Sequence, residues 1–327
     1  MSVYRMRIAL VTPAGPGRRN GNRHTALRWA AFLRAAGHRV SVSTEAVSSG
    51  ADVMLALHAR RSHASIASFP RGKALVVTLT GTDVYRDIRT SKQAQESLEL
   101  AHRLIVLQPK AAEELPARLR RKVRVVVQGS ATGLRQRPVK RKFRVCVIGH
   151  LREEKDPLRT LAALEFLPKE IPLEVVQLGA ALDPALVPRT KDPRYRWLGS
   201  LPHARALRWL ASSHAMVISS RMEGGANVVC EALRVGVPVL ASRIPGNVGL
   251  LGAGYGGYFR VEDERALGRL LVRAATDRAF YRGLKQQIAR LRPMVAPQAE
   301  ARALLAAMSF TGSRARSSSA AARKKAR

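Results

Sequence analysis

The sequence is poor in several residue types, and each shortage excludes a class of protein. It has two cysteines, Cys146 and Cys230, which excludes a disulfide scaffold by number and a zinc site by spacing. Both lie in apolar segments, so we expect buried free thiols and a reducing, cytoplasmic setting. Aromatic residues make up 5% of the chain, so aliphatic side chains must fill the interior. No run approaches the roughly 20 apolar residues of a membrane span, and the apolar stretch at residues 8–11 is too short for a signal peptide.

Acidic residues are also scarce, because 23 Asp and Glu stand against 57 Lys and Arg, a net charge of +34. Such an excess favours anionic partners: nucleic acid, a membrane surface or a phosphorylated substrate. Part of it lies in residues 311–327, a basic tail without acidic residues that we expect to be disordered. A nucleic-acid-binding protein would need a basic stripe on a recognisable module or aromatic platforms for stacking, and the sequence shows neither. The tail still offers a route to nonspecific binding of nucleic acid.

What the sequence contains is two successive series of short apolar strands that alternate with amphipathic helices. This alternation predicts an α/β fold with mainly parallel sheets. We expect two Rossmann-like domains that face a central cleft: a GT-B arrangement with residues 1–138 in the N-terminal domain and residues 139–291 in the C-terminal domain. A basic, Pro-containing stretch at residues 135–142 joins them. A helical segment at residues 292–310 should pack back on the first domain, before the tail at residues 311–327. In such folds ligands bind at the carboxyl ends of the strands.

The element boundaries follow from the positions of the apolar residues. The expected strands are residues 8–12, 39–44, 52–57, 73–79, 104–107, 123–127, 143–148, 173–178, 195–198, 216–219 and 237–241. The expected helices are residues 23–36, 92–101, 111–119, 157–167, 205–211, 227–235, 265–275, 278–291 and 297–308.

The most informative stretch runs from Glu223 to Glu231 and reads Glu-Gly-Gly-Ala-Asn-Val-Val-Cys-Glu. The first carboxylate lies at a strand end and can accept hydrogen bonds from sugar hydroxyls, while the second lies two turns into a helix and can hold a ribose diol. The glycines let the backbone approach a ligand, and the helix N-terminus can hold phosphate, with Asn227 as its N-cap. An ordinary strand–turn–helix connection has the same pattern. The donor-binding candidates are Gly224, Gly225, Ala226, Asn227, Val228 and Glu231, with Gly199 as a weaker one.

A loop with two cations follows an earlier strand of the same domain. Arg152 and Lys155 lie three residues apart after the strand at residues 143–148. Arg can neutralise a diphosphate leaving group with two parallel hydrogen bonds and Lys as a point charge. A solvated loop would contain the same residues. The pair therefore indicates a binding site only because Glu223 and Glu231 lie in the same domain.

This combination of Arg152, Lys155, Glu223 and Glu231 resembles the donor half of GT-B glycosyltransferases of the family-4 type. The likeness covers most of residues 143–291. It implies that the basic pair contacts the diphosphate of a nucleotide sugar, that the first Glu binds the donor sugar and that the second binds the ribose. Two features depart from the family pattern. Many relatives have Phe-Gly two residues after the first Glu, where this chain has Gly-Ala, and the acceptor-domain His common in retaining members has no obvious counterpart.

Three polar loops of the first domain, at residues 13–25, 58–62 and 80–83, follow strands and can therefore face one cleft. Their arginines and the scarcity of aromatic residues suit a small, highly charged acceptor better than a bulky sugar or a lipid. Asp83 has two open interpretations, a general base or a residue that orients an Arg, and a lone His such as His58 is more often structural. The acceptor-binding candidates are Gly17, Arg19, Asn20, Asn22, His58, Arg60, Arg61, Thr82 and Asp83.

Three strings in and beyond these loops resemble one GT-B subgroup, the selenosugar synthases of selenoneine biosynthesis. They are Arg-Asn-Gly-Asn-Arg-His-Thr-Ala at residues 19–26, Leu-Thr-Gly-Thr-Asp at residues 79–83 and Pro-Gly-Asn-Val-Gly-Leu-Leu-Gly at residues 245–252. The resemblance implies that a UDP-sugar, typically UDP-N-acetylglucosamine, reacts with selenophosphate to give a 1-selenosugar, UDP and phosphate. Arg152, Lys155 and Glu223 are then the catalytic residues. No cofactor and no metal are expected, because the cations and the helix start neutralise the leaving group and the chain has no Asp-x-Asp pair.

Two alternatives stay open at this point. A family-4 glycosyltransferase with the same donor site would transfer the sugar to a conventional hydroxyl acceptor. A nucleic-acid-binding protein driven by the net charge would bind tightly and with a steep dependence on salt.

Overall fold

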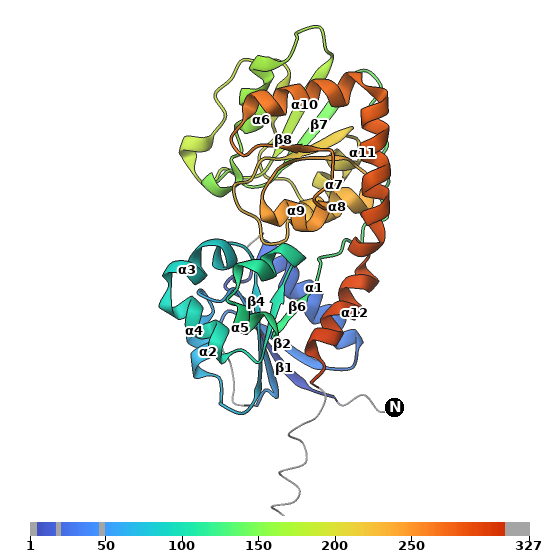
Figure 1. The fold of residues 1–327 in the computed structure, drawn as a ribbon. Helices are drawn as coiled ribbons and strands as arrows, with labels where there is room; N and C mark the ends of the chain where they lie inside the picture. The colour runs from blue at the N-terminus through green and yellow to red at the C-terminus, as the bar shows by residue number, and fades with distance from the viewer. Residues whose placement is uncertain (1–4, 18–20, 46–49, 311–327) are drawn as a thin grey trace, which may run out of the picture.

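The computed structural model describes residues 5–17, 21–45 and 50–310. Over this range the chain forms two lobes, one above the other in Figure 1. The lower lobe contains the first half of the chain and the upper lobe contains most of the second half. Arg19, Asn20 and the basic tail lie outside the described residues.

The first lobe is built on a six-stranded parallel sheet in the order β2-β1-β3-β4-β5-β6. The direction of strand succession reverses between β1 and β3, so the loops after these two strands open a crevice where ligands bind in such folds. The strands are β1 (Arg7–Val11), β2 (Arg39–Ser43), β3 (Val53–Leu57), β4 (Ala74–Leu79), β5 (Arg103–Val106) and β6 (Val123–Val125). The helices are α1 (Gly21–Ala35), α2 (His63–Ser68), α3 (Ile88–Thr90), α4 (Lys92–Leu100) and α5 (Ala117–Arg120).

The second lobe repeats this design with a parallel sheet in the order β12-β11-β10-β7-β8-β9. Here the reversal lies between β7 and β10, at whose ends the loops that contain Arg152 and Glu223 begin. The strands are β7 (Phe143–Ile148), β8 (Leu173–Leu178), β9 (Tyr195–Trp197), β10 (Ala215–Ile218), β11 (Val239–Ser242) and β12 (Tyr258–Phe259). The helices are α6 (Arg159–Ala163), α7 (His203–Ala211), α8 (Asn227–Val235), α9 (Pro245–Leu251), α10 (Glu264–Thr276) and α11 (Arg278–Leu291). The predicted α/β fold with two Rossmann-like sheets is thus confirmed.

The structure corrects several predicted helices, each for a local reason. The helix predicted at residues 111–119 is wrong, because Pro116 separates a 3-10 turn at Pro109–Glu114 from the four-residue α5. The helix predicted at residues 157–167 is shorter in the structure, where α6 is followed by one 3-10 turn at Leu164–Phe166. Helix α9 was not predicted, since two of its seven residues are glycines, although Pro245 stands at its start as helix-initiating prolines do.

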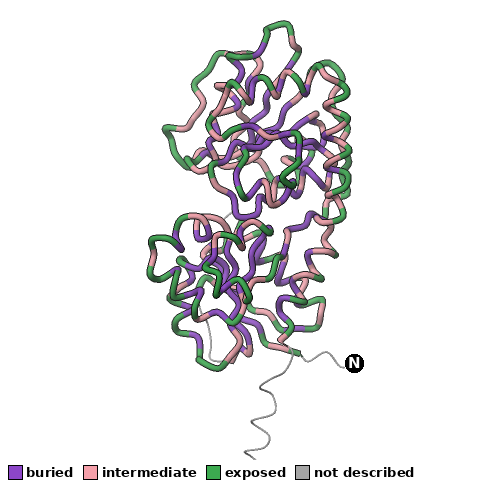
Figure 2. Tube along the Cα trace, viewed as in Figure 1, coloured by how far each residue is buried: buried purple, intermediate pink, exposed green. Residues whose placement is uncertain are grey.

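The core of each lobe consists of aliphatic side chains on the two faces of its sheet, and Figure 2 shows the central strands as buried. Cys146 and Cys230 are buried free thiols, as predicted, and burial raises the pKa of each to about 12. The last helix, α12 (Pro297–Met308), returns from the upper lobe and lies beside α1 (Figure 1). Its Leu304 and Met308 are buried in the core of the first lobe.

Glu300 of α12 anchors this return crossing through buried hydrogen bonds. Its carboxylate is fully buried and accepts hydrogen bonds from Arg28 Nε at 2.8 Å, Trp29 Nε1 at 2.7 Å and the amide of Gly129 at 2.8 Å. The site favours a glycine at position 129, because an added Cβ would lie 3.1 Å from the backbone of Ala296 and from the Glu300 carboxylate, closer than most such contacts. One carboxylate therefore joins α1, α12 and the start of the interdomain connection.

We expect Glu300→Ala to destabilise the protein by about 3–5 kcal/mol, because it leaves the Arg28 guanidinium and two further donors without their partner in the interior. Equilibrium unfolding in urea measures this loss. Glu99→Ala is the control, since Glu99 pairs with Arg118 in an exposed ion pair whose removal should change the free energy of unfolding by about 0.5 kcal/mol or less. Equal effects of the two substitutions would contradict the anchoring role of Glu300.

Candidate active site

The carboxyl edges of the two sheets meet at the interface between the lobes, and glycines allow the contact. A Cβ on Gly224 would lie 2.3 Å from the carbonyl oxygen of Thr80 in the first lobe, and a Cβ on Gly225 would lie 2.3 Å from the Cβ of Leu107. A Cβ on Gly249 of α9 would collide with the Gln108 side chain. The predicted donor loop of the second lobe therefore packs directly on the predicted acceptor loop of the first.

Gly224→Ala is expected to force the lobes apart, because backbone atoms on both sides leave no room for a methyl group. We expect a loss of about 1–3 kcal/mol of stability and at least about a tenfold loss of activity, since the two halves of the site no longer close. Thermal unfolding and steady-state kinetics measure the two effects. Gly254→Ala is the matched control, as a Cβ there meets no atom of the described residues within 4 Å. Wild-type behaviour of Gly224→Ala would show that the lobes are not held in this contact.

Glu223 lies at the switch point of the second sheet, where it binds Lys155. The Lys155 ammonium donates a hydrogen bond to Glu223 Oε1, and Ser220 Oγ donates to the same oxygen at 2.6 Å. Glu223 is 7% exposed, so this ion pair is largely shielded from water. Residues from the ends of β7 and β10 line a small cavity around it, among them Gly149, Lys155, Ser219 and Glu223.

Arg152 lies beside this pair and is more exposed. Its side chain is 46% exposed, and its Nε is 4.0 Å from the nearest carboxylate oxygen, on Glu154. The guanidinium thus has an exposed surface that an anion in the cleft can reach. The structure brings the three predicted catalytic residues, Arg152, Lys155 and Glu223, to one edge of the second sheet.

The N-terminus of α8 differs from the prediction in one respect. Asn227 is the first helical residue and does not cap the helix; Ala226 occupies the N-cap position without a side-chain hydrogen bond. The Asn227 side chain instead accepts a hydrogen bond from Arg28 Nη2 at 3.2 Å, across the interface from α1. The first intrahelical bond runs from the amide of Val229 to the carbonyl of Ala226 at 2.9 Å, so the amides of Asn227 and Val228 precede it. Such amides, with the positive end of the helix dipole, favour an anion.

Glu231, two turns into α8, pairs with a residue that the sequence did not single out. Its Oε1 lies 2.7 Å from His203 Nε2 of α7, and this hydrogen bond raises the pKa of His203. The His24 ring of α1 lies across the interface, 5.8 Å from the His203 ring between centroids. Burial, and then the nearby His203, lower the pKa of His24. Glu231 therefore faces the first lobe at the rim of the interface.

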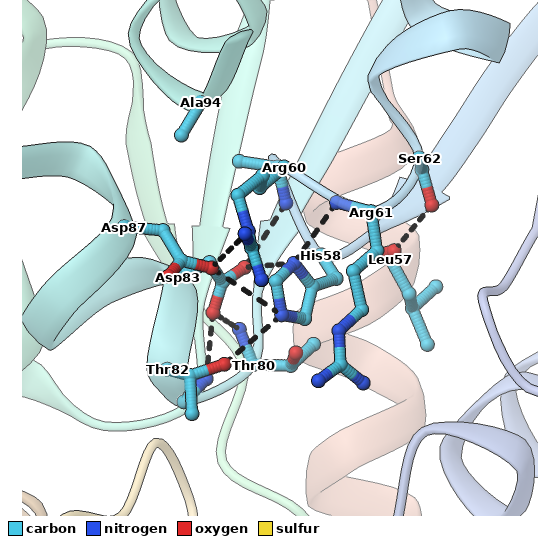
Figure 3. A network of polar contacts seen from close by, with 12 residues as sticks. Leu57, His58, Arg60, Arg61, Ser62, Thr80, Thr82, Asp83, Asp87 and Ala94 are labelled. Atoms are coloured by element: carbon cyan, nitrogen blue, oxygen red, sulfur yellow. Dashed lines mark hydrogen bonds and ion pairs between the residues drawn. The ribbon is translucent and has the colours of Figure 1, made fainter. Parts of the chain in front are cut away.

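In the first lobe Asp83 organises the loops that were predicted to face the acceptor (Figure 3). It is fully buried, and its oxygens accept hydrogen bonds from the amides of Thr80 at 2.8 Å, Gly81 at 2.8 Å and Ala59 at 3.0 Å. A carboxylate that is bound in this way positions the two loops. The sequence left two roles open for Asp83, a general base and a partner of an Arg. In the structure its carboxylate accepts hydrogen bonds from these amides and lies 3.8 Å from His58 Nδ1.

His58 and the two arginines after it surround this centre. His58 is 2% exposed and has a positive φ of 76°; its Nε2 lies 3.1 Å from Thr82 Oγ1, and burial lowers its pKa. Arg60 donates to Asp87 at 3.0 Å. Arg61 is exposed, and Figure 3 shows its side chain pointing away from the carboxylates that Arg60 reaches. Of the two arginines, Arg61 is thus the one directed toward open space.

The remaining candidates lie at the edges of the site. Gly17 is an exposed turn residue with a φ of 81°, and Asn22 lies in the first turn of α1. Gly199 has a φ of 63° after β9, and its carbonyl accepts a hydrogen bond from the amide of Gly179 at 2.8 Å. Arg19 and Asn20 belong to the part of the first loop that the structure does not describe.

Sequence reasoning missed Ser220, His203, Arg28 and Gly246. Ser220 lies three residues before Glu223 and belongs to the same loop, so its position was a usable signal. His203 and Arg28 carried none, because each belongs to another helix and meets the site only through the fold. Gly246 lies against the backbone of Glu223, where an added Cβ would be 2.0 Å from the carbonyl oxygen.

Among the described residues no group of three or more His, Cys, Asp or Glu side chains has an arrangement that could hold a metal ion. Within the same part of the chain, no helix combines the length and the apolar character that are needed to cross a bilayer.

The chain is similar to known glycosyltransferases in sequence and in structure. Residues 142–277 match the family described as "Glycosyl transferases group 1". A relative from Xenopus tropicalis, glycosyltransferase 1 domain-containing protein 1, is 25% identical over 268 residues, which cover 71% of this chain and 77% of the relative.

Solved structures extend the similarity to both lobes. HepE of Anabaena, solved in complex with UDP and glucose, is 15% identical with a TM-score of 0.72, over 93% of this chain and 99% of HepE. Sucrose-phosphate synthase from Thermosynechococcus elongatus is 18% identical with a TM-score of 0.70, over 93% of this chain and the whole of that one. Residues 142–277 thus form a group 1 glycosyltransferase domain, and the chain is a glycosyltransferase with the GT-B fold.

Proposed function

We propose that this glycosyltransferase is a selenosugar synthase, which transfers a sugar, N-acetylglucosamine by resemblance, from a UDP-sugar to selenophosphate. The main support for the proposed UDP-sugar site is the ion pair of Glu223 and Lys155 at the switch point of the second sheet. This pair lies beside Arg152 and the N-terminus of α8. HepE, which shares this fold, was solved in complex with UDP and glucose, which is consistent with a UDP-sugar as donor.

The donor is proposed to lie along the loop from Glu223 to Glu231. Glu223, fixed by Lys155 and Ser220, accepts hydrogen bonds from sugar hydroxyls, and the diphosphate sits against Arg152 and the amides of Asn227 and Val228. Glu231 accepts hydrogen bonds from the ribose diol, for which it exchanges its bond to His203. These cations and amides stabilise the charge that develops on the departing UDP.

The acceptor is proposed to bind at the loops of the first lobe. The exposed guanidinium of Arg61, with Arg60 next to it, attracts a small, highly charged anion such as selenophosphate. Asp83 is buried and accepts hydrogen bonds from the amides of Thr80, Gly81 and Ala59, so it positions the loops on which the acceptor is proposed to bind. An anionic selenium needs no strong general base.

The proposed reaction proceeds in two steps, a transfer of the sugar and a hydrolysis. Selenium attacks C1 of the sugar, so a C1–Se bond forms while the C1–O bond to UDP breaks and the bonding pair leaves with UDP. Water then cleaves the Se–P bond, which releases inorganic phosphate and the 1-selenosugar.

The test is UDP release from UDP-N-acetylglucosamine with different acceptors. The proposal expects rapid release with selenophosphate, slower release with thiophosphate and only background release with sugar or amino-alcohol acceptors. Rapid release with a hydroxyl acceptor and none with selenophosphate would replace the proposal with a conventional group 1 transferase while the donor site stands.

A further inference from the structure

At the junction between the two lobes lie four cations that have no carboxylate partner within the described part of the chain. Arg135 lies on the connection between the lobes, Arg234 in the last turn of α8, Lys285 on α11, and Arg292 in the 3-10 turn Arg292–Val295 that leads into α12. Among the described residues, no Asp or Glu forms an ion pair with any of the four.

These residues belong to segments that hydrogen bonds and contacts hold together. The connection joins α8 through the amide of Gln136, which donates to the carbonyl of Val235 at 3.0 Å. Lys285 Nζ donates to the carbonyl of Gly236 at 2.7 Å, and also to the Gln136 side chain. The turn that contains Arg292 packs on α8. The pKa of Arg292 is lowered first by burial and then by Arg135 and Arg234, which means that the guanidinium groups repel one another.

Two of the arginines also have buried donors with no acceptor. Arg234 Nε and Arg292 Nε and Nη2 are shielded from solvent and have no hydrogen-bond partner among the described residues. A buried donor on a charged group that is left without an acceptor is unfavourable. Such donors are uncommon in folded proteins and point to an acceptor outside the chain, such as a bound anion or water.

Helix dipoles explain only part of this charge. The C-termini of α8 and α11, near Arg234 and Arg292, each carry the equivalent of about half a negative charge. Together they offset about one of four positive charges, and about three remain. A phosphate group carries about two negative charges near neutral pH and several acceptor oxygens that match guanidinium donors.

We propose that this junction is a binding site for a phosphate-bearing small anion, held by Arg135, Arg234 and Arg292 with Lys285 at its edge. The site is separate from the active site, because it lies at the C-terminal end of α8 while the donor loop lies at the N-terminal end. Since the connection and the turn before α12 are the two crossings between the lobes, an anion here ties the lobes together. This function is independent of the identity of the glycosyl acceptor.

The experiment compares thermal unfolding of the full chain in chloride and in inorganic phosphate at equal ionic strength, with the affinity for phosphate from calorimetry. Arg292→Gln and Arg234→Gln are each expected to weaken phosphate binding by about tenfold, the loss of one charge-assisted contact. In chloride both variants should melt higher than the wild type, because they relieve repulsion, and in saturating phosphate this advantage should vanish or reverse.

Two controls exclude other sources of the effect. Arg205→Gln removes an exposed charge from α7 and should leave phosphate binding unchanged. Arg152→Gln tests whether phosphate occupies the active site instead. The proposal is overturned if Arg292→Gln and Arg234→Gln bind phosphate as the wild type does, if Arg205→Gln loses as much, if the loss is confined to Arg152→Gln, or if both junction variants melt lower than the wild type in chloride.

Discussion

Glu223→Gln is expected to lower kcat/KM for the UDP-sugar by at least about a hundredfold. The substitution keeps the shape of the side chain but removes the negative charge that faces Lys155 and the sugar hydroxyls. A charged acceptor in a site shielded from water is worth about 3 kcal/mol in the transition state, and each 1.4 kcal/mol is a factor of ten in rate. Steady-state kinetics with a saturating acceptor measure the change.

Folding must be monitored in the same variant, because Lys155 loses its partner. Its side chain is 23% exposed, so water compensates in part, and we expect a moderate decrease in melting temperature with a native circular dichroism spectrum. Glu99→Gln, on the surface, is the matched control and should leave both kinetics and stability unchanged. A Glu223→Gln enzyme within about threefold of the wild type would remove Glu223 from the donor site.

Arg152→Ala is expected to lower kcat by about 10²–10³ with little effect on stability. Its side chain is 46% exposed and its ion pair with Glu154 is long, at 4.0 Å, so it contributes little to the stability of the fold. In the proposed reaction it faces the charge that develops on the leaving diphosphate, and preorganised donors at such positions contribute about 3–4 kcal/mol to the transition state. Rapid-quench measurement of the chemical step separates this effect from binding.

A split between kcat and KM makes the prediction specific. If Arg152 acts mainly in the transition state, kcat falls more than KM rises; a rise in KM alone would give it a role in ground-state binding only. Arg208→Ala on the exposed face of α7 controls for the loss of one positive charge from the whole molecule. An unchanged kcat in Arg152→Ala would contradict the assignment of the leaving group to this loop.

The sequence predicted the fold well because buried parallel strands leave continuous apolar runs. The boundaries of β7, β8, α8, α11 and α12 agree with the prediction to the residue, since each run ends at a clear polar or Gly/Pro boundary. The errors fall where several short elements share one apolar pattern. Residues 109–120 have helical spacing, but Pro116 divides them into two short elements. Helix α9 was not predicted because its glycines are typical of loops.

The sequence predicted those residues of the candidate site that directly follow strands. It did not predict the contacts that the tertiary structure forms between distant helices. Arg152, Lys155 and Glu223 follow strands, so parallel topology alone places them at one edge. The partnership of Glu231 with His203, and that of Asn227 with Arg28, each join helices far apart in the chain. For Asp83 the sequence leaves two roles open, and only the structure reveals the backbone amides from which its carboxylate accepts hydrogen bonds.

The most direct test of the proposed function is mass spectrometry of the products from UDP-N-acetylglucosamine and selenophosphate. The account predicts a 1-seleno-N-acetylglucosamine with the isotope pattern of selenium, together with one UDP and one phosphate per turnover. It also predicts that this product disappears in Glu223→Gln and Arg152→Ala. A selenium-free glycosylated product, or unreacted UDP-sugar in the presence of a folded enzyme, would contradict it.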